Sequence, residues 1–73
     1  MDQAIGGHYS VQDLRLTKKA GTAGPDFHVR GYDSIGNLLL STWHIGEHSM
    51  QMECDAWERR GAVKVPFDPI KEL

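Results

Sequence analysis

The sequence predicts a small α+β domain, an antiparallel β-meander with one α-helix packed on one face in the order β-β-β-α-β. Residues 27–32 and 38–45 flank the turn sequence "DSIGN", which is typical of a hairpin. Residues 50–60 instead repeat apolar side chains at helical spacing. With 73 residues, the chain has room for one domain with a small core.

The stretch "DSIGN", residues 33–37, predicts the hairpin turn, with Asp33 at its first position and Gly36 in the left-handed conformation. Pairing Asp33 with Asn37 places Tyr32 opposite Leu38, Arg30 opposite Leu40 and His28 opposite Thr42, and alternation then assigns the side chains to two faces. The expected core face carries Phe27, Val29, Leu39, Trp43 and Ile45, with Gly31 and Ser41. The expected opposite face carries His28, Arg30, Tyr32, Leu38, Leu40, Thr42 and His44.

The helix is expected to follow Ser49, a favourable N-cap, and to end before Gly61 at the C′ position. Met50, Cys54 and Trp57 recur at i, i+4 and i+7 and form its buried stripe. Packed on the core face of the hairpin, this stripe would make both tryptophans core residues. Replacement of Trp57 or of Trp43 by alanine is therefore expected to unfold the domain.

Residues 9–17 allow two interpretations. A capping box at Ser10 and Asp13 would open a helix that ends near Gly21. The preferred alternative is a strand with a bulge near Asp13, because Leu14 and Leu16 would lie on different sides of a helix. Residues 18–26 predict a loop, and "AVKVPF" predicts a short last strand. The domain is expected to span residues 8–67, with a flexible N-terminus at 1–7 and a tail at 68–73.

Composition excludes several classes of function. Eight basic and ten acidic residues give a formal net charge of −2, which argues against a general nucleic-acid binder. Cys54 is the single cysteine, so no disulfide forms within the chain, and a reducing cytoplasm is the expected location. The N-terminus lacks the pattern of a signal peptide, and the longest aliphatic run is far too short to span a membrane.

Metal binding and catalysis are not expected. His44, His48 and Cys54 have ligand chemistry, but Gly46 interrupts the helix that would bring the two histidines onto one face. A fourth ligand would have to come from His28 or His8. Cys54 lies on the buried stripe, where its thiolate is disfavoured, and no hydrolase or phosphate-binding motif is present. The sequence therefore predicts neither an enzyme nor a cofactor.

The face opposite the helix is the expected binding surface, because leucines on an uncovered sheet face form an exposed apolar patch. The predicted binding residues are His28, Arg30, Tyr32, Leu38, Leu40 and His44. An ordinary solvated face, or one covered by a chain terminus, is the alternative. In size, charge and meander-plus-helix outline the chain resembles small phage proteins that block host machinery, anti-CRISPR proteins among them. The resemblance implies a protein-binding inhibitor; a nucleic-acid-binding regulator and a homodimeric antitoxin-like module are the alternatives.

Overall fold

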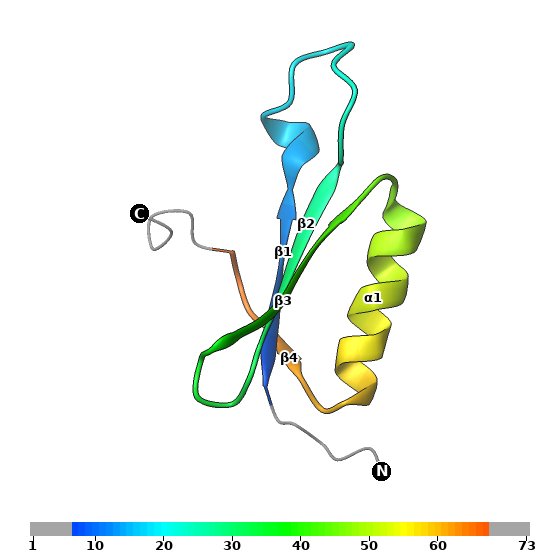
Figure 1. Cartoon of the computed structure of the whole chain (residues 1–73). Helices are drawn as coiled ribbons and strands as arrows, with labels where there is room; N and C mark the ends of the chain where they lie inside the picture. The colour runs from blue at the N-terminus through cyan, green and yellow to red at the C-terminus, as the bar shows by residue number, and fades with distance from the viewer. Residues whose placement is uncertain (1–6, 68–73) are drawn as a thin grey trace.

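The computed structural model describes residues 7–67 and confirms the α+β class and the predicted order of elements (Figure 1). The elements are β1 (His8–Asp13), a 3-10 turn η1 (Leu14–Leu16), β2 (Phe27–Tyr32), β3 (Leu38–His44), α1 (Glu47–Arg59) and β4 (Val63–Lys64). The sheet order is β3-β2-β1-β4; β1, β2 and β3 pair antiparallel, and β4 pairs parallel to β1. The expectations for the flexible N-terminus and the tail lie, except for Gly7, outside the described residues.

The ambiguous segment 9–17 is a strand followed by a 3-10 turn. β1 pairs with β2 over its whole length without a register shift, so the bulge expected near Asp13 is wrong. The change of phase comes instead from η1, whose N-cap Asp13 accepts a hydrogen bond from the backbone N–H of Arg15 at 3.0 Å. This short polar cap explains why the apolar pattern fitted neither a regular strand nor a helix.

The turn between β2 and β3 forms as predicted. Asp33 N–H donates to the carbonyl oxygen of Asn37 at 2.9 Å, and Gly36 has a φ of 94°. The Asp33 carboxylate accepts hydrogen bonds from the backbone N–H groups of Ile35 and Asn37. These bonds, that from Asn37 first, hold the pKa of Asp33 below its ordinary value. Tyr32 lies opposite Leu38, also as predicted.

Beyond that first pair the predicted register is wrong. Gly31 lies opposite Leu40 and Arg30 opposite Ser41, because a bulge accommodates one extra residue of β3. A shift of one residue moves every later side chain of a strand to the other face of the sheet. Leu40, Thr42 and His44 therefore face α1, whereas Ser41 and Trp43 lie on the open face of the sheet.

The bulge removes three residues from the predicted core. Leu39, Trp43 and Ile45 are 50%, 58% and 77% exposed. Phe27 and Val29 are buried as expected, since β2 keeps its predicted phase. The core consists of Tyr9, Val29, Cys54, Trp57 and Ala62, with Val11 and Met50 packed against it. It therefore lies between α1 and the two central strands, not beneath β3.

Helix α1 begins two residues before the predicted N-cap Ser49. Gly46 is the N-cap instead, with a φ of 88° that a side chain would disfavour. At the other end Gly61 adopts the predicted left-handed conformation, with a φ of 89°. The buried stripe is confirmed: Cys54 and Trp57 are buried and Met50 is partly so. Gly31 gives Trp57 its space, since a Cβ atom there would lie 1.9 Å from the indole ring.

Candidate functional site

The six predicted binding residues divide between the two faces of the sheet. His28, Arg30, Tyr32 and Leu38 lie on the open face, opposite α1, as their pairing and alternation require. Leu40 and His44 lie on the helix face, because the bulge reverses their side. The structure thus brings four of the residues to one surface and separates the other two from it.

His28 is covered by Trp43, its cross-strand neighbour on the open face. The two rings stack with centroids 3.8 Å apart and planes 3° from parallel. The His28 Nε2 atom also forms a 2.5 Å hydrogen bond with the Ser41 hydroxyl. The imidazole therefore contacts two residues of β3, Trp43 and Ser41. Trp43 is consequently an exposed indole that contacts His28 through one ring face.

Arg30 is covered by Phe67, whose ring centroid lies 4.6 Å from the guanidinium carbon. The chain that follows β4 passes to the side of the sheet opposite α1, as Figure 1 shows for the orange segment. The Arg30 side chain is thereby buried, although it lies on the face that carries no helix. Partial cover by the C-terminal side of the chain is the alternative that the sequence left open for this face.

The accessible part of the open face is aromatic and aliphatic. It comprises Tyr32 and Leu38 at one end of the hairpin, Trp43 toward the other, and Phe67 over the middle, and we call these four residues the open-face patch. Leu38 and Trp43 are both more than half exposed. Apolar and aromatic groups of this size on one surface are characteristic of an interaction site.

His44 and Leu40 belong to a different cluster between β3 and α1. The Glu53 carboxylate accepts hydrogen bonds from the Thr42 hydroxyl and, at 3.0 Å, from the Trp57 indole N–H. His44 Nε2 lies 2.6 Å from the same carboxylate, and His44 Nδ1 lies 3.1 Å from the Ser49 hydroxyl. This polar network joins the outer strand to the helix.

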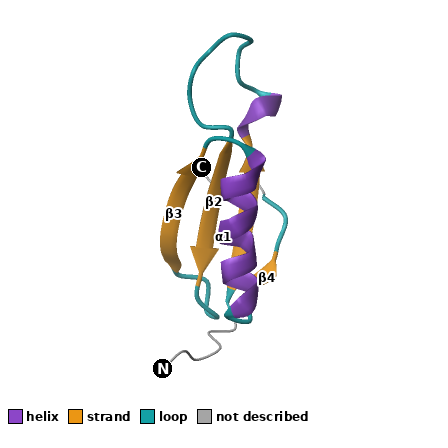
Figure 2. Ribbon diagram, turned by 90° about the vertical axis from the view of Figure 1, so that its right-hand side faces the viewer, coloured by secondary structure: helices purple, strands orange, loops and turns teal. Residues whose placement is uncertain are grey.

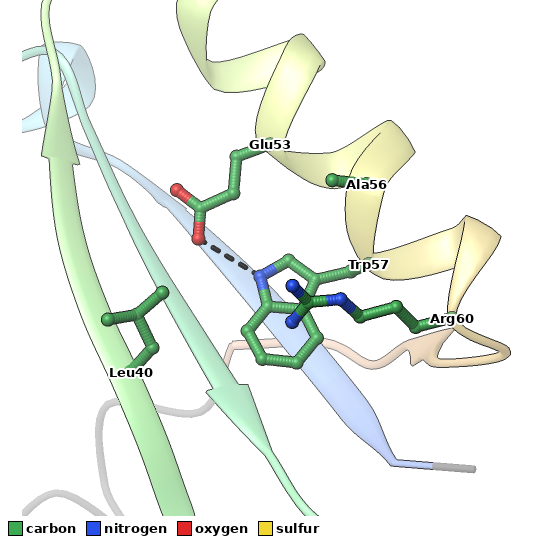
Figure 3. Close-up of a pocket in the computed structure, with 5 residues that line it drawn as sticks. All are labelled: Leu40, Glu53, Ala56, Trp57 and Arg60. Atoms are coloured by element: carbon green, nitrogen blue, oxygen red, sulfur yellow. Dashed lines mark hydrogen bonds between the residues drawn. The ribbon is translucent and has the colours of Figure 1, made fainter. Parts of the chain in front are cut away.

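The network keeps Glu53 ionised. Burial acts to raise the pKa of Glu53, but the hydrogen bonds from Thr42, His44 and Trp57 outweigh it and hold that pKa below its ordinary value. Beside the carboxylate lies a cavity of about 150 Å³ lined by Leu40, Glu53, Ala56, Trp57 and Arg60 (Figure 3). In Figure 3 a dashed line marks the hydrogen bond from Trp57 to Glu53, and the side chain of Leu40 lies on the other side of the cavity.

Ser49, His44 and Glu53 follow the order of a nucleophile, a base and an orienting acid. The cavity beside Glu53 is lined by neither Ser49 nor His44. Burial also raises the pKa of the Cys54 thiol, which disfavours the reactive thiolate. The contacts of the network join α1 to β3.

Within residues 7–67, no three His, Cys, Asp or Glu side chains gather in an arrangement that could hold a metal ion. His44 is engaged by Glu53 and Ser49, whereas Cys54 packs in the core against the sulfur of Met50 at 3.6 Å. In the same part of the chain, no helix is long and apolar enough to cross a membrane.

Sequence reasoning missed Trp43, Ser41 and Phe67 as residues of the open face. Two of them were missed for one reason, the bulge in β3. The run of three leucines at 38–40 was the available signal, because three consecutive apolar residues cannot all obey an alternating pattern. Nothing in the sequence indicated that Phe67 would lie against Arg30, 37 positions away.

Fold and surface together define a small α+β domain with a four-stranded mixed sheet and an aromatic patch on its helix-free face. Comparison with known proteins adds no relative: no family model, no curated protein and no solved structure matches the chain.

Proposed function

We propose that this protein is a non-enzymatic protein-binding module and that the open-face patch is its contact surface. The observation that supports this most strongly is the state of Trp43, which is 58% exposed and stacks on the ring of His28. Exposing a large indole is unfavourable unless a partner covers it, and tryptophan is among the residues most enriched in binding hot spots.

Orientation before binding makes the tryptophan effective. A side chain that is already ordered loses little rotational freedom when a partner closes over it. The Ser41–His28–Trp43 contacts supply that order in the free protein. Leu38 and Phe67 then supply apolar surface around the indole that would exclude water from the contact.

A protein with these properties acts by occupying a surface of its partner. We therefore extend the proposal to a steric inhibitor or regulator, the mode of action of the small phage proteins that the sequence resembles in outline. The polar network at Glu53 has a structural role in this proposal, and no reaction is assigned to it.

The test is paired affinity capture from a nuclease-treated bacterial lysate, using the wild-type chain, Trp43→Ala and the control Ile35→Ala. Ile35 is exposed in the β2–β3 turn and lies outside the patch. The captured protein is then purified and titrated against all three chains. We expect Trp43→Ala to weaken binding by at least about 30-fold, the size of a hot-spot loss of about 2 kcal/mol. Unchanged affinity of Trp43→Ala would refute the patch, and weaker binding of Ile35→Ala would move the contact to the turn.

The exposed Trp43 also favours a second candidate, single-stranded nucleic acid. Aromatic side chains on an open antiparallel sheet stack on unpaired bases in several RNA-binding modules. The net charge of −2 weighs against it. Anisotropy of a labelled single-stranded RNA oligonucleotide decides: binding that is lost with Trp43→Ala and falls steeply with salt would support this candidate, and no binding at low salt would exclude it.

A further inference from the structure

The start of α1 carries a continuous hydrogen-bonded row of three side chains, Ser49, His44 and Glu53. The Ser49 Oγ atom lies 3.1 Å from His44 Nδ1, and His44 Nε2 lies 2.6 Å from the Glu53 carboxylate. A short connection joins the end of β3, which supplies the histidine, to the start of α1, which supplies the other two residues (Figure 2). A hydroxyl, a base and an orienting carboxylate within hydrogen-bond reach form the arrangement that activates a serine.

The chemistry of the row decides where its protons lie. Burial opposes ionisation of Glu53, but its hydrogen bonds hold the pKa below the ordinary value, and an ionised carboxylate only accepts. In neutral His44, Nε2 therefore carries the hydrogen, and Nδ1 accepts the hydroxyl proton of Ser49. The two ring nitrogens thus exchange the roles that they have in the usual serine triad, while the direction of proton transfer from serine to histidine is the same.

Ser49 is accessible to a reagent, whereas the two residues behind it are largely covered. The Ser49 residue is partly exposed, and the side chains of His44 and Glu53 are 16% and 14% exposed. The carbonyl oxygen of Ile45 is a second acceptor for the hydroxyl, but at 3.5 Å it is more distant than His44 Nδ1. The single hydroxyl proton therefore favours His44.

The residues that flank Ser49 suit an apolar acyl group. Met52, three positions further along the helix, is its neighbour on the helix surface and is 59% exposed. Ile45, whose carbonyl oxygen lies next to the hydroxyl, is 77% exposed. The two side chains offer apolar surface on both sides of the serine along the chain.

The first turn of α1 favours the negative charge that forms when a serine attacks an ester. Ser49 lies in that turn, where the helix dipole is positive and backbone N–H groups have no acceptor within the helix. Both stabilise the oxyanion of a tetrahedral intermediate. The Asp26 carboxylate accepts the N–H of Gly46 at the same end, at 2.9 Å, but Lys18 lies 2.7 Å from that carboxylate and offsets its charge.

We propose that Ser49 is an acylation site, with His44 as its general base, that accepts a short apolar acyl group from an activated ester. The Ser49 oxygen attacks the ester carbonyl carbon, and its proton passes to His44 Nδ1. The new C–O bond replaces the bond to the leaving alcohol, which takes the proton from His44. The products are acylated Ser49 and the free alcohol. Glu53 is a positioning residue in this step, because it acts through His44.

This inference goes beyond the proposed function, which uses the open face of the sheet and assigns no reaction to the network. His44 and Ser49 lie on the helix side, away from Trp43. Acylation is measured without a partner protein, so the two proposals fail independently.

The experiment is reaction of the full chain with p-nitrophenyl acetate, followed by release of nitrophenolate and by peptide mass mapping. We expect a burst of nitrophenolate and an acetyl group on Ser49, both lost in Ser49→Ala. His44→Ala should be acetylated at least about 100-fold more slowly, the size of a lost general base, and added imidazole should restore labelling of Ser49. Ser34, an exposed serine of the β2–β3 turn, is the internal control and should stay unmodified.

Substitutions of Glu53 test its positioning role. Glu53→Gln should slow acetylation of Ser49 at least about tenfold, because the neutral amide no longer fixes the hydrogen of His44 on Nε2. Glu53→Asp keeps the charge and should recover part of that rate. Asp55→Asn, at an exposed carboxylate of the same helix, should leave the rate unchanged. Circular dichroism verifies that each chain is folded before the rates are compared.

Three results would overturn the site. Equal release of nitrophenolate by the wild type and Ser49→Ala would show that another group is the nucleophile. Acetylation of Ser41, whose hydroxyl contacts His28, in place of Ser49 would move the reactive serine to the open face. Labelling of Ser49 at the wild-type rate in His44→Ala would show that the histidine is not its base.

Discussion

β2 and β3 are neighbours in one hairpin, but they differ in burial and in the elements that surround them. The first five residues of β2 are buried, whereas β3 has no buried residue. β2 lies between β1 and β3, with α1 on one face and Trp43 and Phe67 on the other. β3 has a strand of the described residues on one side only, and α1 contacts it through Glu53, which binds Thr42 and His44. Position in the sheet, more than residue type, therefore decides which side chains are protected: Leu39 and Trp43 are exposed while His28 and Arg30 are buried.

The largest loss of folding stability is expected from Trp57→Ala, which removes a buried side chain between α1 and β2. Trp57 is buried against Gly31 of β2 and donates its indole N–H to Glu53. We expect a loss of about 3–5 kcal/mol in the free energy of unfolding, enough to unfold a domain of this size. Urea denaturation followed by circular dichroism measures it. A cooperative transition at the wild-type midpoint would contradict the packing of α1 on β2.

A smaller effect is expected from Glu53→Gln, which weakens the attachment of α1 to β3. The substitution exchanges a carboxylate that accepts hydrogen bonds from Thr42 and Trp57 for a neutral amide, and we expect a cost of about 1–2 kcal/mol near pH 7. Denaturant titrations of the variant and of Asp55→Asn, an exposed carboxylate on the same helix, give the comparison. A larger cost for Asp55→Asn would contradict the assignment.

The stability of Glu53→Gln should also depend on pH differently from that of the wild type. The pKa of Glu53 is lower in the folded protein than its ordinary value of 4.5, so its ionised form contributes stability above that pH. The contribution is lost as pH falls below 4.5 through the folded pKa. The wild type should therefore lose more stability than Glu53→Gln on acidification through this range. Equal acid sensitivity of the two chains would show that the network does not stabilise the carboxylate.

The smallest effect on folding stability is expected from Trp43→Ala, because Trp43 is exposed whereas Trp57 is buried. The exposed indole contacts His28 through one ring face, and such a stack contributes about 1 kcal/mol. We expect a folded protein with a transition close to that of the wild type and, under the proposed function, a large loss of partner binding. Unfolding of this variant would instead restore Trp43 to the core, as the sequence had predicted.

The sequence predicted what depends on local chemistry. The turn at Asp33–Asn37, the left-handed Gly61 and the stripe Met50, Cys54 and Trp57 each follow from a few neighbouring residues, and each formed as expected. The class of fold followed from these elements, because a hairpin and an amphipathic helix can bury their apolar faces only against each other.

The candidate surface could not be predicted from local sequence patterns, because it depends on strand register and on contacts between distant residues. Alternation gives the two faces of a strand only while the register holds, and one bulge in β3 exchanged Leu40 and His44 for Ser41 and Trp43. The cover of Arg30 by Phe67 joins residues that are distant in the chain. The amino-acid sequence by itself determined the elements and their turns, since those arise from short-range sterics and hydrogen bonds. Only the tertiary structure decided which faces are covered, because register and burial are set by contacts among all the elements at once.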